Sequence, residues 1–110
     1  MAHDLDADCI TACNACADAC DRCSTACLQE PEVKPMARCI ALDIDCAALC
    51  RLAAACIARG SEFARRLCGL CALLCDTCAE ECARHEHRHC KDCALACITC
   101  AQACRRMVAV

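Results

Sequence analysis

The stretch CITACNACADACDRCSTAC, residues 9–27, places a cysteine at every third or fourth position. Residues three and four apart lie on one face of an α-helix, so the cysteines of this stretch form a single stripe. In a helical bundle, such a stripe is the seam that faces the partner helices, and it normally holds Leu or Ile. The stretch therefore predicts a helix whose buried face consists of thiols.

The same spacing recurs along the chain, where 20 of the 110 residues are cysteine. Steps of three and four continue through residues 68–82 and 90–104, whereas residues 39–56 carry a thinner stripe with Asp43 and Ala53 among its positions. Asp43 has two interpretations: a carboxylate at the rim or helix surface, which is the commoner situation for Asp, or a polar group beside the thiol core. The cysteines are Cys9, Cys13, Cys16, Cys20, Cys23, Cys27, Cys39, Cys46, Cys50, Cys56, Cys68, Cys71, Cys75, Cys78, Cys82, Cys90, Cys93, Cys97, Cys100 and Cys104.

Breaks between the stripes divide the chain into four predicted helices. Pro31 and Pro35 bound the first break, and Gly60 followed by Ser61 is typical of a helix C-cap followed by an N-cap. The third break, at residues 84–89, has neither Gly nor Pro. The predicted helices span residues 4–28, 35–59, 62–84 and 87–107. Because the connections are short, we expect one all-α domain over residues 1–110, an antiparallel up-down-up-down four-helix bundle with a cysteine-lined core.

Composition argues against several classes of protein. The first eight residues contain no basic segment followed by an apolar one, so we expect no signal peptide and a cytoplasmic location, where thiols stay reduced. The formal charge of −3 and the single aromatic residue, Phe63, give no basic patch or stacking platform for nucleic acid. No apolar run of about 18 residues predicts a membrane span. With only two Gly and two Pro, the chain is also unlike a loop-rich disulfide scaffold.

A core of thiols indicates binding of a soft metal ion. If the 20 cysteines formed Zn(Cys)4 sites, each site would carry a charge of about −2, and no Lys or Arg lies on the stripes to offset it. Cu(I) accepts two or three thiolates, and one ion per bridging thiolate replaces one proton, so the core stays near neutral. We therefore expect roughly 20 Cu(I) ions per chain, with a metallothionein-like buffer for Zn, Cd or Ag as the alternative.

Other chemistries fit the pattern less well. Cys9-x3-Cys13-x2-Cys16 matches the iron–sulfur triad of radical S-adenosylmethionine enzymes, but the spacing continues along the whole helix and the chain is too short for their barrel. No cysteine stands alone beside a base, as an activated thiol in an enzyme would, so no catalytic residue is expected. A bundle that serves only to bind a protein partner is the structural alternative.

With four such stripes in succession, the chain resembles the bacterial cytosolic copper storage proteins over essentially its whole length. The resemblance rests on the stripes Cys9–Cys27, Cys39–Cys56, Cys68–Cys82 and Cys90–Cys104. It implies a four-helix bundle whose interior holds many Cu(I) ions, assembly into a homotetramer, and storage rather than catalysis. Exported relatives carry a signal peptide, so the resemblance also implies a cytosolic location.

One end of the predicted bundle collects further soft ligands. Met36 lies three residues before Cys39, His85 lies three after Cys82, and His87 lies three before Cys90. Thioether and imidazole both bind Cu(I), and the family that the chain resembles carries Met or His at the open end of the bundle. We therefore expect metal uptake through Met36, His85 and His87, with His89, which is off the stripe, as the lesser candidate.

The opposite end and the outer surface carry apolar residues. Leu5 and Met107 extend their stripes beside His3, and we expect an apolar plug there rather than a metal site. Large apolar side chains that point away from the stripes are expected to form subunit contacts: Ile44, Leu73 and Leu95.

Overall fold

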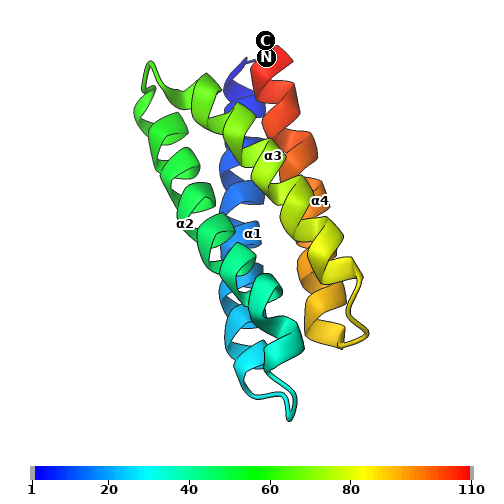
Figure 1. Ribbon diagram of the computed structural model, residues 1–110. Coiled ribbons are helices and arrows are strands. Elements are labelled where there is room, and N and C mark those ends of the chain that lie inside the picture. The colour runs from blue at the N-terminus through cyan, green and yellow to red at the C-terminus, as the bar shows by residue number, and fades with distance from the viewer. Residues whose placement is uncertain (1, 110) are drawn as a thin grey trace.

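The computed structural model describes the backbone of residues 2–109 and the side chains of residues 5–109. The helices are α1 (Ala2–Leu28), α2 (Ala37–Arg59), α3 (Ala64–Ala83) and α4 (Arg88–Ala109), and a 3-10 turn, η1 (Lys34–Met36), precedes α2. Successive helices run in opposite directions, and both termini lie at the same end (Figure 1). The prediction of an all-α, antiparallel up-down-up-down bundle is confirmed.

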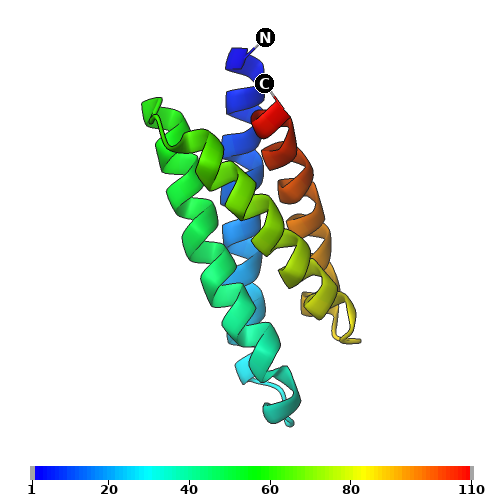
Figure 2. The same cartoon turned by 45° about the horizontal axis from the view of Figure 1, so that its top comes forward.

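The bundle is elongated, with extents of 46 × 17 × 17 Å. Each helix packs against its two neighbours, α1 against α2 and α4, and α3 against the same two helices. The α1–α2 and α3–α4 connections therefore share the end opposite the termini, as Figures 1 and 2 show. None of the described helices is both long enough and apolar enough to span a lipid bilayer.

The helix ends follow local sequence, with two corrections to the predicted boundaries. Gly60 is the C-cap of α2 with φ 68°, and its N–H bonds to the carbonyls of Cys56 and Ile57, as predicted. Ser61 is not the N-cap of the next helix, because α3 begins at Ala64 and the Ser61 hydroxyl accepts the Phe63 N–H at 3.1 Å in the preceding turn. Residues 84–87 lie outside both α3 and α4, so the predicted helices over 62–84 and 87–107 were each too long at this connection.

The core consists mainly of thiols and alanines. Cysteine stripes from the four helices face one another, and small buried residues such as Ala17, Ala53 and Ala101 lie between them. At the end with the termini, Met107 is buried and Leu5 packs against the core, while the side chain of His3 lies outside the described residues. Small side chains let the helices approach closely, and this brings the sulfur atoms of different helices within contact distance.

Candidate metal-binding core

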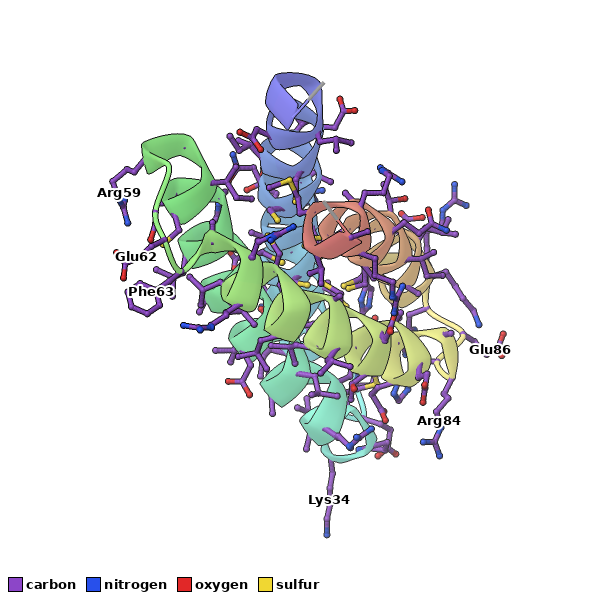
Figure 3. The ribbon with its side chains drawn as sticks, turned by 90° about the horizontal axis from the view of Figure 1, so that it is seen from above. Lys34, Arg59, Glu62, Phe63, Arg84 and Glu86 are labelled. Atoms are coloured by element: carbon purple, nitrogen blue, oxygen red, sulfur yellow. The ribbon has the colours of Figure 1, made fainter. Side chains whose placement is uncertain are left out.

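Nineteen cysteines are fully buried, and the remaining one, Cys56, is 6% exposed. All 20 are free thiols. Sulfur atoms on different helices approach closely: Cys50 Sγ lies 3.5 Å from Cys71 Sγ, and Cys39 Sγ lies 3.5 Å from Cys82 Sγ. Seen along the bundle, the sulfur atoms lie between the helices rather than on the outer surface (Figure 3). The four stripes therefore merge into one continuous thiol column.

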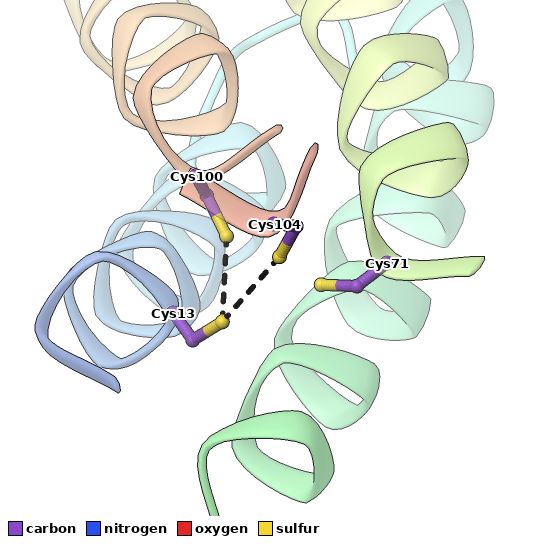
Figure 4. Close-up of side chains that lie close together, drawn as sticks. All are labelled: Cys13, Cys71, Cys100 and Cys104. Atoms are coloured by element: carbon purple, nitrogen blue, oxygen red, sulfur yellow. Dashed lines mark hydrogen bonds between the residues drawn. The ribbon is translucent and has the colours of Figure 1, made fainter. Parts of the chain in front are cut away.

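Within this column the thiols converge in groups of four. In each group the sulfur atoms lie within 4.8 Å of one another. Figure 4 shows one group, in which Cys13 Sγ lies 3.7 Å from Cys100 Sγ and 3.8 Å from Cys104 Sγ, with Cys71 facing them from α3. Further groups are Cys16, Cys46, Cys50 and Cys75; Cys16, Cys20, Cys46 and Cys97; Cys20, Cys78, Cys93 and Cys97; and Cys23, Cys27, Cys39 and Cys90.

The sulfur spacing suits metal ions that bridge two or more thiolates. A metal–sulfur bond of about 2.3 Å places two sulfurs on either side of an ion at about 4.6 Å when the arrangement is linear, and closer when it is bent. The sulfur atoms of Cys16 and Cys97, 3.7 Å apart, and of Cys20 and Cys93, 3.6 Å apart, are within about 1 Å of the linear separation. Neighbouring groups share members, so one thiolate would contact ions above and below it.

Charge separates the candidate metals more sharply than geometry does. The groups of four thiols supply the convergence that tetrahedral zinc sites need. Among the described residues, however, the buried polar or charged side chains are Ser24, Asp43 and Glu81, with no buried Lys or Arg. Negative thiolate charge can then be balanced only by the ions themselves, which favours one monovalent cation per thiolate.

Two thiols at the end that carries His89, those of Cys27 and Cys90, are poor anions when no metal is bound. Burial raises the pKa of the Cys27 thiol to about 11, and burial also raises the pKa of Cys90. Both thiols therefore keep their protons at neutral pH. A soft cation must displace those protons, so metal binding and proton release are coupled in this core.

Asp43 lies inside the thiol column, and the interpretation of this residue as a rim or surface carboxylate was wrong. Its side chain is fully buried, and Oδ1 accepts hydrogen bonds from the thiols of Cys78 and Cys93, each at 3.3 Å, and of Cys82 at 3.5 Å. Burial is the main cause that raises the pKa of Asp43 to about 8. The sequence did indicate this position, because Asp43 follows Cys39 by four residues and therefore lies on the same helix face as the cysteines.

Among the described histidines, His89 is the one that contacts the thiols, although we expected it to be only the lesser candidate. Its Nδ1 lies 3.5 Å from Cys90 Sγ, 3.7 Å from Cys23 Sγ and 3.8 Å from Cys27 Sγ. On the other side of the ring, Nε2 lies 2.8 Å from Glu30 Oε2. Because a carboxylate accepts the Nε2 proton, the neutral ring keeps its Nδ1 lone pair toward the sulfurs. A sequence signal existed, since His89 precedes Cys93 by four residues on the same helix.

The three residues predicted to admit metal lie at this end of the bundle but differ in their contacts. Met36 is buried in the core at 2% exposure. His85 Nε2 lies 2.7 Å from Glu81 Oε2, and this hydrogen bond is the main cause that lowers the pKa of Glu81. His87 stacks on His89, with ring centroids 5.3 Å apart. His85 and His87 lie in the α3–α4 connection, outside the helices, so the helical spacing from Cys82 and Cys90 does not set their side-chain directions.

Cys56 has a different environment from the other cysteines of α2. Its sulfur accepts a hydrogen bond from Arg59 Nη2 at 3.5 Å, one helical turn further along. The sequence step of six residues from Cys50 already set it apart from the stripe. A guanidinium next to this thiol would repel an arriving cation.

Comparisons with known proteins agree with this geometry. The family model of the copper storage proteins matches residues 2–109. A solved structure of a cytosolic copper storage protein from Streptomyces lividans, described with five coppers, superimposes with a TM-score of 0.96 at 41% identity, covering 99% of this chain and 96% of that chain. The Cu(I)-bound copper storage protein BsCsp3 superimposes with a TM-score of 0.91 at 43% identity, covering 94% of this chain and 98% of that chain. YhjQ of Bacillus subtilis, described as an uncharacterized cysteine-rich protein, is 46% identical over 80 residues, which are 73% of this chain and 68% of that protein.

Proposed function

The chain belongs to the copper storage protein family, and we propose that it stores Cu(I) in the cytosol as thiolate complexes inside the bundle, with roughly one ion per cysteine. This proposal rests on the column of overlapping four-thiol groups, in a core where none of the described Lys or Arg side chains is buried. Such a core stays near neutral only when each thiol proton is exchanged for a singly charged ion. No catalytic residue is proposed.

The proposed ligands are the sulfur atoms of the column, and each thiolate bridges two ions so that metal and thiolate alternate. Thiolate is the ligand class that best matches Cu(I). Helical spacing supplies pairs within one helix, such as Cys46 and Cys50 at 3.9 Å, and the bundle supplies pairs between helices. The proposed ligands are Cys9, Cys13, Cys16, Cys20, Cys23, Cys27, Cys39, Cys46, Cys50, Cys56, Cys68, Cys71, Cys75, Cys78, Cys82, Cys90, Cys93, Cys97, Cys100 and Cys104.

We propose that ions enter at the end of the bundle that carries Met36, His85 and His87. At this end His89 lies beside the first thiols that an entering ion would reach. The support is that His89 Nδ1 faces Cys23, Cys27 and Cys90, and that the ring of His87 stacks on that of His89. Imidazole and thioether are competent ligands for Cu(I) and bind it less strongly than thiolate. Ions would therefore pass from this end toward the thiols below it.

The test is a Cu(I) titration of reduced, metal-free protein under anaerobic conditions against a chromogenic Cu(I) chelator. We expect the chelator to stay metal-free until roughly 20 equivalents have been added, because bridging thiolates bind one ion each. A plateau at about five ions, with zinc bound equally well, would replace copper storage by the metallothionein-like buffer for Zn, Cd or Ag. Loss of copper to the chelator throughout would leave only a structural role for the bundle.

We also propose that four copies assemble into a homotetramer through apolar side chains on the outer surface. Leu73 and Leu95 are each 65% exposed and Ile44 is 56% exposed, which is a large apolar area to leave in water. Light scattering coupled to size exclusion at micromolar concentration is expected to give four times the mass of one chain. A monomer mass under those conditions would refute the assembly without affecting the copper capacity.

A further inference from the structure

A groove of about 460 Å³ opens on the side of the bundle between α1 and α4, near the end that carries His89. Its floor includes His89 and the thiol-bearing residue Cys23, whose Sγ lies 3.7 Å from His89 Nδ1. Its walls include Ala19 and Ala26, whose small side chains leave the space open. The volume is in the range of sites that bind small molecules rather than bare ions.

The side chains that line this groove include two arginines and one aspartate, an excess of positive charge on a protein whose formal charge is −3. Arg22 from α1 and Arg88 from α4 line it, together with one carboxylate, Asp92. Arg88 Nε lies 3.6 Å from Asp92 Oδ1, whereas none of the ion pairs among the described residues uses Arg22. A guanidinium presents donors in a fork that matches a carboxylate, so the rim suits an anionic ligand.

We propose that this groove docks a small anionic complex of Cu(I) with a carrier thiol. The carrier is a low-molecular-weight thiol with carboxylate groups, and the ion passes from it to the protein at His89 and Cys23. The inference rests on the proposed copper storage and adds the chemical form in which copper arrives. Two thiolates on one Cu(I) give a complex with a net charge of about −1 before any carboxylate is counted. The arginines would hold that charge while the metal faces the groove floor.

The transfer is an exchange of ligands without change of oxidation state. A bond forms between Cu(I) and Cys23 Sγ as the bond to one carrier sulfur breaks, and the proton of the Cys23 thiol goes to the departing carrier thiolate. A neighbouring protein thiol then replaces the second carrier sulfur in the same way, so two carrier thiols leave with two protons and the copper remains Cu(I). His89 Nδ1, held toward Cys23 by the hydrogen bond that Nε2 donates to Glu30, binds Cu(I) before Cys23 does and is released when the second protein thiolate binds.

The experiment compares an anionic with a cationic copper donor by stopped-flow absorbance of the copper–thiolate bands. The donors are the Cu(I) complex of glutathione and the acetonitrile complex of Cu(I), used with the reduced full-length protein at low ionic strength. Arg22→Glu is expected to slow transfer from the glutathione complex by about fivefold or more, with the effect shrinking as salt is added. Transfer from the acetonitrile complex is expected to be unchanged or faster.

Two further variants complete the test. Ala26→Leu fills the groove without changing charge and is expected to slow the glutathione donor at any salt concentration. Arg66→Glu reverses an exposed arginine that lines a different groove, between α3 and α4, and is the matched control that should leave both donors unaffected. The proposal would be overturned if Arg22→Glu slowed copper transfer from both donors equally. It would also be overturned if neither Arg22→Glu nor Ala26→Leu changed the rate of transfer from the glutathione complex. A wild-type capacity of five ions or fewer from either donor would instead refute copper storage itself.

Discussion

Replacing Asp43 by Asn should remove a large pH-dependent contribution to the stability of the metal-free bundle. Asp43 is fully buried, and burial raises the pKa of its carboxyl from 3.8 to about 8. The unfolded chain releases this proton near pH 4, while the folded protein keeps it until about pH 8. Between those values the folded state binds more protons than the unfolded state, so the free energy of unfolding falls as pH rises.

The magnitude follows from the size of the pKa shift. Each pKa unit corresponds to about 1.4 kcal/mol, so a shift of roughly four units gives an upper value of about 6 kcal/mol above pH 8. Well below pH 4 the contribution vanishes, because the carboxyl is then protonated in both states. Asparagine does not titrate, and its side-chain oxygen can still accept hydrogen bonds from the thiols that surround Asp43. The variant is therefore expected to gain stability relative to the wild type as pH increases.

The assay is urea unfolding followed by circular dichroism, with reductant and a metal chelator present, at several values between about pH 4.5 and 8.5. The measured quantity is the difference in free energy of unfolding between variant and wild type, in which the titration of shared groups cancels. Asp45→Asn, at an exposed position on the same helix, is the control and should give a constant difference. Parallel profiles for Asp43→Asn and the wild type would refute a buried, proton-retaining carboxyl in the thiol column.

Other predictions test the core, the uptake end and the helix cap. His89→Ala should slow uptake of the first Cu(I) ions by about tenfold in stopped-flow measurements, since its imidazole faces the thiols, and an unchanged rate would contradict that role. An indicator dye should report about one proton released per Cu(I) bound, whereas about four per ion would favour tetrahedral thiolate sites. Cys75→Ser should lower the copper capacity by at least one ion, because this thiol contacts those of Cys46 and Cys50. Cys56→Ser should lower the capacity less, because the Cys56 thiol accepts a hydrogen bond from a guanidinium. Equal losses of capacity in the two variants would contradict this difference. Gly60→Ala should cost about 1 kcal/mol in thermal unfolding because of its positive φ, while Gly69→Ala, where a Cβ meets only ordinary contact, should not.

Sequence pattern alone was sufficient for the architecture of this protein. A cysteine every three or four residues can form one continuous face only on an α-helix, and no single helix can bury such a face. Four stripes joined by short connections therefore require a bundle, and Gly60 at its predicted C-cap shows how local backbone chemistry ends a helix. The soft-metal chemistry was equally predictable, because it depends on residue type and on the absence of cations from the stripes.

The ends of the helices were less predictable, because extrapolated periodicity holds only as far as the helix continues. His85 and His87 were assigned by helical spacing from Cys82 and Cys90, yet residues 84–87 form a connection in which side-chain direction follows the turn. His89 lies inside α4, and its ring is set by a hydrogen bond to Glu30, 59 residues earlier in the chain. A contact between residues so far apart in sequence depends on how the two connections meet at one end of the bundle.

Helical periodicity in the sequence predicts a set of faces: four thiol stripes, a carboxylate on one of them, and the helices that carry them. How those faces meet depends on the packing of the four helices. The packing of four helices places Asp43 of α2 within hydrogen-bonding distance of thiols on α3 and α4, and it gathers thiols from different helices into groups of four. The physical reason is that helical periodicity is a local property of the backbone, whereas burial, pKa and metal geometry depend on distances between elements that only packing sets.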